Sequence, residues 1–276
     1  MNNTFNFNRF GKYFLYDLKR QWKNIGMLML IFALFPIIFY ILYMFFAALF
    51  SDEGLMRLFF GISTDGPTLW TRFGMFVAMT AIFVMIFPSR AYGEITDKAK
   101  GAEWLMLPAS RLEKFVSMLL VSLVVIPLAY VAVYLLSDAF VCLLDGSCGD
   151  SLLSFRINTA TYGDPFVIPA NGFWILASTI VGNAIIFLLG GLTFKKWKVA
   201  GTLLVLFALQ LVLSGLTSAF ITNADLEWWG EWFEDWAIRH ADSLDIWLNA
   251  FINFWFLLLL AVCGTWSWFR IKRLQH

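Results

Sequence analysis

The segment RAYGEITDKAKGAEWLMLPASRLEK, at Arg90–Lys114, is a charged stretch between two long uncharged apolar runs. It begins with an arginine at the end of one run and ends with a lysine at the start of the next. Because lysine and arginine gather on the cytoplasmic side of membranes, we expect this segment to face the cytosol. It is too short to form a domain. It is long enough for one or two short helices at the membrane surface, which a soluble partner can push.

The composition is that of a membrane protein. Hydrophobic residues make up 60% of the 276-residue chain and charged residues 14%, and the mean hydropathy is +0.73. Soluble domains carry about 25% charged residues, and those are spread along the sequence. The net charge of +1 gives no indication of a nucleic-acid partner. Residues 1–24 lack the pattern of a cleavable signal peptide, so the first apolar run is expected to act as an uncleaved signal.

The apolar runs predict an all-α, polytopic membrane protein. A span needs about 20 apolar residues, and Pro36 is expected to kink the first one. Residues 1–24 form a cytoplasmic helix in this prediction, and residues 25–276 form the transmembrane domain with a cytoplasmic loop at 90–114 and outer loops at 137–172 and 222–246. The six predicted spans are 27–50, 73–88, 115–136, 173–192, 200–220 and 247–268.

Charge sets the orientation of this arrangement. Of the 20 lysines and arginines, only Arg57, Arg72, Arg156 and Arg239 fall on the predicted outer side. Such a bias places both termini in the cytoplasm, as expected for a multi-pass protein of the cytoplasmic (inner) membrane.

The N-terminal segment predicts an amphipathic helix. Phe10, Phe14, Leu18 and Trp22 recur every four residues, and lysines and arginines occupy the other faces. Asn6 or Asn8 is a candidate N-cap. The pattern indicates a helix on the inner membrane surface, in contact with lipid. The alternative is a positively charged flank that only orients the first span.

Several classes of mechanism lack the residues they need. The six spans, as drawn, contain no Asp, Glu, Lys, Arg or His, which argues against ion-coupled transport and against an intramembrane enzyme. The two histidines lie far apart in the sequence, so no metal site is expected, and no residue pattern suggests a bound cofactor. No phosphate-binding loop of the G-x-x-x-x-G-K-[ST] type occurs. Any energy for work must therefore come from another chain.

The loop at 90–114 has an ordered pattern. Gly101 interrupts the polar part, residues 103–107 predict a short helix, and Pro108 ends it. Ser110 and Glu113 have the spacing of a capping box at the start of the third span. We expect a short amphipathic helix held rigidly at the base of a long one. The alternative is an ordinary interfacial loop whose leucines enter the lipid.

This loop resembles the coupling region of the membrane subunits of type-2 ATP-binding-cassette exporters. Those subunits show acidic residues, a glycine, a glutamate, leucines and Pro-x-Ser-[Arg/Lys] before the third of six spans. The spacings from Gly101 to Glu103 and from Glu103 to Pro108 are each one residue shorter here, and Lys98 and Lys100 replace an acid-rich run. The matching residues are Glu94, Gly101, Glu103, Leu105, Leu107, Pro108, Ser110 and Arg111.

The resemblance implies a role without catalysis. The loop would sit in a groove of a separate ATPase subunit, and two membrane subunits, identical or different, would open an outward path. Contact residues would be Glu103, Trp104, Leu105 and Leu107, and the N-terminal helix would brace the contact. A lipid-like or amphiphilic substrate suits the aromatic-rich spans, although lipid-facing phenylalanine gives the same composition. The alternative is a non-transporting scaffold or assembly subunit of a cell-envelope complex.

Two features of the outer segments have alternative readings. Cys142 and Cys148 flank a five-residue stretch and predict a small disulfide loop if that side is oxidising, with free thiols as the alternative. An acidic segment carries several tryptophans that predict an interfacial aromatic belt or, alternatively, an exit gate. The tryptophans are Trp228, Trp229, Trp232 and Trp236.

Overall fold

All regular structure in the described part of the chain is helical. The computed structural model describes residues 5–49, 69–96, 101, 104, 106–144, 152, 170–223, 239 and 241–274. The elements in chain order are α1 (Phe7–Ala33), α2 (Phe35–Leu49), α4 (Leu69–Ala91), the 3-10 helix η1 (Gly93–Thr96), α6 (Arg111–Leu120), the π-helix η2 (Val121–Val125), α7 (Ile126–Leu144), α8 (Ala170–Thr193), α9 (Lys198–Asn223) and α11 (Ala241–Leu274).

The described residues contain five helical segments long and apolar enough to cross a membrane. They contain six if the bent pair α1 and α2 counts as one span. These segments coincide with the six apolar runs of the sequence. An all-α multi-pass membrane protein is therefore the architecture of this chain.

The first span is bent at Pro36. Helix α1 runs without interruption from the predicted interfacial segment into the first half of the span, and α2 continues after a bend of 42°. Asn6 is the N-cap of α1, and its side chain accepts a hydrogen bond from the Asn8 backbone N–H at 3.0 Å. Proline has no N–H and clashes with the carbonyl four residues earlier, so the helix breaks at Leu34, just before Pro36.

The third span is longer than its apolar run. Helices α6, η2 and α7 form one continuous segment from Arg111 to Leu144. The π-helical turn lies just before Pro127, where the Ile126 N–H bonds to the Val121 carbonyl five residues earlier. The segment continues eight residues beyond Leu136. The prediction that Asp138 lies in an outer loop is therefore wrong, because this residue belongs to α7.

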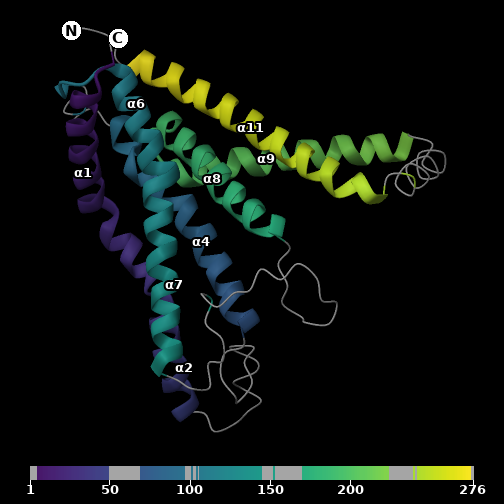
Figure 1. The fold of residues 1–276 in the computed structure, drawn as a ribbon. Coiled ribbons are helices and arrows are strands. Elements are labelled where there is room, and N and C mark those ends of the chain that lie inside the picture. Colours follow the sequence, from purple (N-terminus) through teal and green to yellow (C-terminus); the bar gives the residue numbers. More distant parts are fainter. Residues whose placement is uncertain are drawn as a thin grey trace.

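A core of aromatic rings joins α4 to α7, and Figure 1 shows these helices running beside α1. The rings of Phe83 and Tyr130 stack at 4.3 Å between centroids, and Phe76 meets Tyr134 at 5.0 Å. Helix α8 packs closely on α4, because a Cβ at Gly191 would lie 2.9 Å from the Ser89 Cα. A side chain at this glycine would push the two helices apart.

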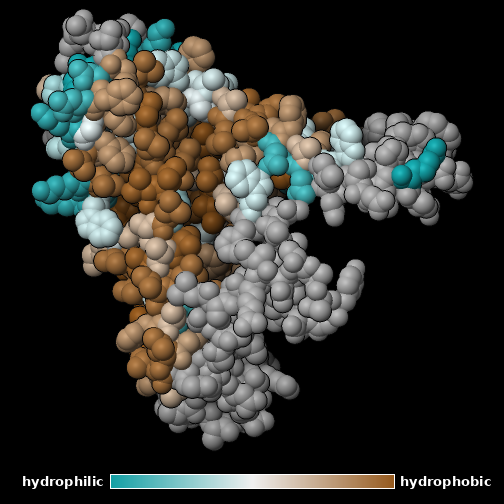
Figure 2. Space-filling view, viewed as in Figure 1, coloured by the Kyte–Doolittle hydropathy of each residue, from teal (hydrophilic) through white to brown (hydrophobic). Residues whose placement is uncertain are grey.

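Helices α9 and α11 project from the other helices (Figure 1). In the most apolar window of each, only 6% is buried within the chain. Figure 2 shows hydrophobic residues over most of the visible bundle, with hydrophilic residues gathered at the end where α1 and α6 begin. We call this polar end the base, and the described sides of the bundle in this view are mainly apolar.

Candidate functional site

The base is formed by the helix ends that the sequence predicts to be cytoplasmic. The start of α1 contacts the start of α6 through Arg9 and Glu113, and the ring of Phe115 in α6 lies 5.3 Å from that of Trp268 near the end of α11. The Arg270 guanidinium donates to the Thr193 carbonyl at the end of α8, at 3.2 Å. The starts of α1 and α6 and the ends of α8 and α11 therefore meet at one end of the molecule, together with the segment at 90–114.

The first polar cluster of the base, which we call the clamp, is centred on Glu113. Its carboxylate is fully buried and accepts from Arg9 Nε at 2.8 Å and from Arg9 Nη2 at 2.8 Å. It also accepts from the backbone N–H groups of Asn6, at 2.9 Å, and Ser110, at 2.8 Å. The Ser110 side chain accepts from the Glu113 N–H at 3.3 Å, so the predicted capping box is confirmed. The clamp ties the start of α1 to the end of the loop at 90–114.

A second polar cluster lies deeper in the base, around Asp17 of α1. Its carboxylate is 1% exposed and accepts from the Tyr92 hydroxyl at 2.8 Å and the Ser117 hydroxyl at 2.7 Å. Tyr92 follows α4 and Ser117 lies in α6. One carboxylate thus joins α1, α4 and α6. A buried carboxylate without such donors would be strongly unfavourable, so this cluster favours one arrangement of the three elements.

The start of the predicted coupling helix is held between these clusters. Trp104 is fully buried, and the Lys114 ammonium donates to its carbonyl at 2.9 Å and lies 5.0 Å from the centre of its ring. Gly101 is also buried, and a Cβ there would lie 2.4 Å from the Ile95 carbonyl oxygen. Glycine is therefore required at this position for close backbone contact. Because Trp104 is fully buried, it fixes the segment to the rest of the chain and leaves no exposed surface for contact with a partner.

The turn η1 is tied to two other helices. The Lys198 ammonium at the start of α9 donates to the Gly93 carbonyl at 2.7 Å. Glu94, one of the residues matching the exporter pattern, lies 3.8 Å from the Arg20 guanidinium of α1. The segment is therefore connected to α1, α6 and α9 as well as to α4, from which it leaves.

A small apolar surface remains exposed at the base. Met106 is 80% exposed, Pro108 is exposed and Leu112 is 45% exposed, whereas Leu107 packs against the core. Met106 and Leu112 were not among the residues predicted for partner contact.

The structure describes some of the predicted site residues and not others. Gly101, Trp104, Leu107, Pro108, Ser110 and Arg111 lie together at the base, whereas Glu103 and Leu105 lie outside the described residues. In α1, Phe14 and Leu18 pack against the core, Phe10 stacks near Phe14 at 5.9 Å, and Trp22 is 57% exposed. Two members of the predicted lipid-facing stripe therefore contact protein.

The predicted outer features fall mostly outside the described residues, and this holds for Trp228, Trp229, Trp232 and Trp236. Cys142 is disulfide-bonded, and Cys148 lies outside the described residues, so their pairing stays a prediction. Arg72 and Asp138 form a buried ion pair at 3.2 Å, and Asp138 also accepts from the Leu152 N–H at 2.8 Å. The pair lies in two helices of spanning length, one residue before the predicted span 73–88 and two residues after the predicted span 115–136.

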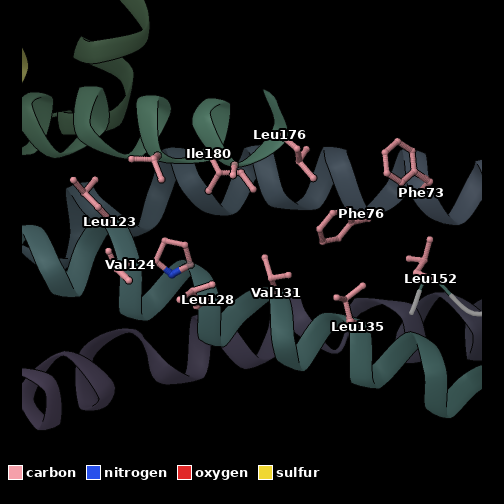
Figure 3. Close-up of a pocket in the computed structure, with 13 residues that line it drawn as sticks. Phe73, Phe76, Leu123, Val124, Leu128, Val131, Leu135, Leu152, Leu176 and Ile180 are labelled. Atoms are coloured by element: carbon pink, nitrogen blue, oxygen red, sulfur yellow. The ribbon is translucent and has the colours of Figure 1, made fainter. Parts of the chain in front are cut away.

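An apolar groove of about 410 Å³ lies between α4, the η2–α7 segment and α8 (Figure 3). Side chains of Val131 and Leu135 on α7 face those of Leu176 and Ile180 on α8 across it, and Phe73 and Leu152 lie at one end. Phe73 follows Arg72 in the sequence, and the Leu152 N–H donates to Asp138, so this end of the groove adjoins the ion pair. The groove offers apolar surface between helices of spanning length.

In the described ranges, no group of three or more His, Cys, Asp or Glu side chains is placed to hold a metal ion. Comparison with protein-family models, with curated proteins and with solved structures gives no match to this chain. The features that bear on its function are the polar clusters of the base and the apolar groove.

Proposed function

We propose that this chain is the membrane subunit of an ATP-driven exporter of the ATP-binding-cassette type, acting with a separate ATPase subunit. The residues 90–114 form the coupling segment that receives the push of the ATPase. The observation that carries the proposal is the clamp. A buried carboxylate joins the end of the coupling segment to α1 and caps the helix that leads into the third span.

A segment fixed in this way transmits displacement instead of absorbing it. Trp104 and Gly101 are buried against Lys114 and Ile95, so the helix start cannot slide without breaking these contacts. The outer face of the same segment presents Met106, Pro108 and Leu112. The exposed apolar face offers contact area that provides binding free energy with a soluble partner. The buried residues beneath it hold that face in a fixed position.

The remaining surfaces suit the other partners of such a subunit. Helices α9 and α11 bury little surface within the chain and leave their sides for lipid and for a second membrane subunit, identical or different. The apolar groove between α4, α7 and α8 suits the hydrocarbon part of a lipid-like or amphiphilic substrate. The chain itself is proposed to carry out no catalysis.

Site-specific photocrosslinking in native membranes tests the proposal. A benzophenone amino acid replaces Met106 in one variant and Trp197 in the matched control, because these side chains are 80% and 82% exposed and both belong to the base region. We expect the Met106 variant to form an adduct with a chain carrying a phosphate-binding loop, identified by mass spectrometry, and the Trp197 variant to form little of it.

The scaffold alternative gives a different result. In that case the adducts at Met106 contain envelope proteins without a phosphate-binding loop, and no ATPase is recovered. Equal ATPase adducts at Met106 and Trp197 would also count against the proposed docking face.

A further inference from the structure

A second groove, distinct from the one in Figure 3, lies between α1 and the junction of η2 with α7. It has a volume of about 370 Å³, within the range of ligand pockets. Its lining includes Lys19, Gln21, Trp22, Met29, Ile126 and Ala129. Along α1, the distance from Lys19 to Met29 is about 15 Å at 1.5 Å per residue. Lys19, Gln21 and Trp22 lie in the part of the groove nearer the base, which we call the polar end and which Leu15 and Leu18 also line, and the rest is apolar.

Two observations at the polar end indicate a ligand. Lys19 is exposed and forms no ion pair with the part of the chain that the structure describes. Gln21 is 2% exposed, and its Oε1 has no hydrogen-bond donor among the described residues. Its amide is also hydrogen-bonded to Asp17, whose carboxylate accepts, so Nε2 is the atom already used. A buried acceptor of this kind requires a hydroxyl, an amine or water.

We propose that this groove binds an anionic phospholipid of the leaflet next to the base, of the phosphatidylglycerol kind. The phosphate pairs with the Lys19 ammonium, a headgroup hydroxyl donates to Gln21 Oε1, and an acyl chain lies along Met29, Ile126 and Ala129. Trp22 is 57% exposed, and tryptophan is a residue that commonly meets lipid headgroups. Basic residues beside spanning helices select anionic lipids in this way. This site does not rest on the proposed function, because no ATPase takes part in it.

Native mass spectrometry of the purified full-length chain tests the site. Delipidated protein is titrated with phosphatidylglycerol or phosphatidylcholine of identical acyl chains, and the fraction carrying a first bound lipid is measured. We expect phosphatidylglycerol to bind roughly fivefold more tightly, as one lysine near the surface provides. Lys19→Gln should abolish this preference, whereas Lys12→Gln, an exposed lysine on the same helix outside the groove, should keep it.

A second pair of variants tests the apolar part. Ala129→Phe fills the groove and should lower binding of both lipids, whereas Ala208→Phe at an exposed position of α9 should not. Equal binding of the two lipids by the unmodified chain overturns the proposal. So does an equal loss with Lys12→Gln and Lys19→Gln, which would indicate unspecific attraction to the cationic helix. If Ala129→Phe does not fold, the lysine pair alone decides.

Discussion

The carboxylate of Glu113 accepts the guanidinium fork of Arg9, although 104 residues separate them in the sequence. The two ends of this contact differ in exposure, since the Arg9 side chain is 35% exposed and that of Glu113 is fully buried. Arg9 can turn to water when its partner is lost. Glu113 is also the acceptor for the backbone N–H groups of Asn6 and of the buried Ser110.

This asymmetry predicts unequal effects of the two truncations. Glu113→Ala leaves the N–H groups of Asn6 and Ser110 and the Arg9 guanidinium without an acceptor, and should lower the free energy of unfolding by about 3 kcal/mol. Arg9→Ala leaves the buried Glu113 carboxylate with its two backbone donors, and should cost less, about 2 kcal/mol. Thermal unfolding in detergent, followed by circular dichroism, measures both. Glu94→Gln is the control with little expected effect, because the Glu94 side chain is 26% exposed and lies 3.8 Å from Arg20. Equal losses for Arg9→Ala and Glu113→Ala would contradict the central role given to Glu113.

Gly101→Ala should loosen the coupling segment. The new Cβ would lie 2.4 Å from the Ile95 carbonyl oxygen, a distance that no backbone tolerates without movement. We expect faster trypsin cleavage after Lys98 and Lys100, seen by limited proteolysis of the protein in detergent. Gly11→Ala is the matched control, because no atom lies within 4 Å of a Cβ at that helical position. The same cleavage rate in both variants would show that Gly101 is not a close-contact position.

Features that depend on neighbouring residues were predictable from the sequence. The Asn6 cap, the Ser110–Glu113 capping box and the bend at Pro36 each involve residues within four positions of one another. The positions of the helices follow equally from long apolar runs. These signals are local, so the sequence contains all the information that they need.

The clamp and the Asp17 cluster were not predictable in this way. Tyr92 and Ser117 meet Asp17 from 75 and 100 residues away, and no periodicity marks such a contact. In the sequence, charged residues mark the ends of the predicted spans, and this places Asp138 in an outer loop. The helix continues past Asp138 because Arg72, on the neighbouring helix, compensates its charge.

The Arg72–Asp138 pair predicts a non-additive result. Asp138→Leu leaves a buried guanidinium without its carboxylate and should destabilise the protein by about 3 kcal/mol or more. The double variant Arg72→Met, Asp138→Leu removes both charges and should recover most of this loss. Unfolding of the two single variants and the double variant, measured under one set of detergent conditions, gives the coupling energy. A double variant as unstable as the sum of the singles would mean that the two side chains act independently.

The orientation of the base predicts opposite labelling of two introduced cysteines. Met106→Cys, at an 80% exposed position of the coupling segment, should react with a membrane-impermeant maleimide only after the cells are opened. Leu143→Cys, at an 85% exposed position near the other end of the third span, should react in intact cells. The background carries Cys263→Ala, because Cys263 is a free thiol. Lysines and arginines gather at the base, and positive charge is retained on the cytoplasmic side. Labelling of Met106→Cys in intact cells would place the coupling segment outside, where no ATP-driven partner can reach it, and would rule out the proposed function.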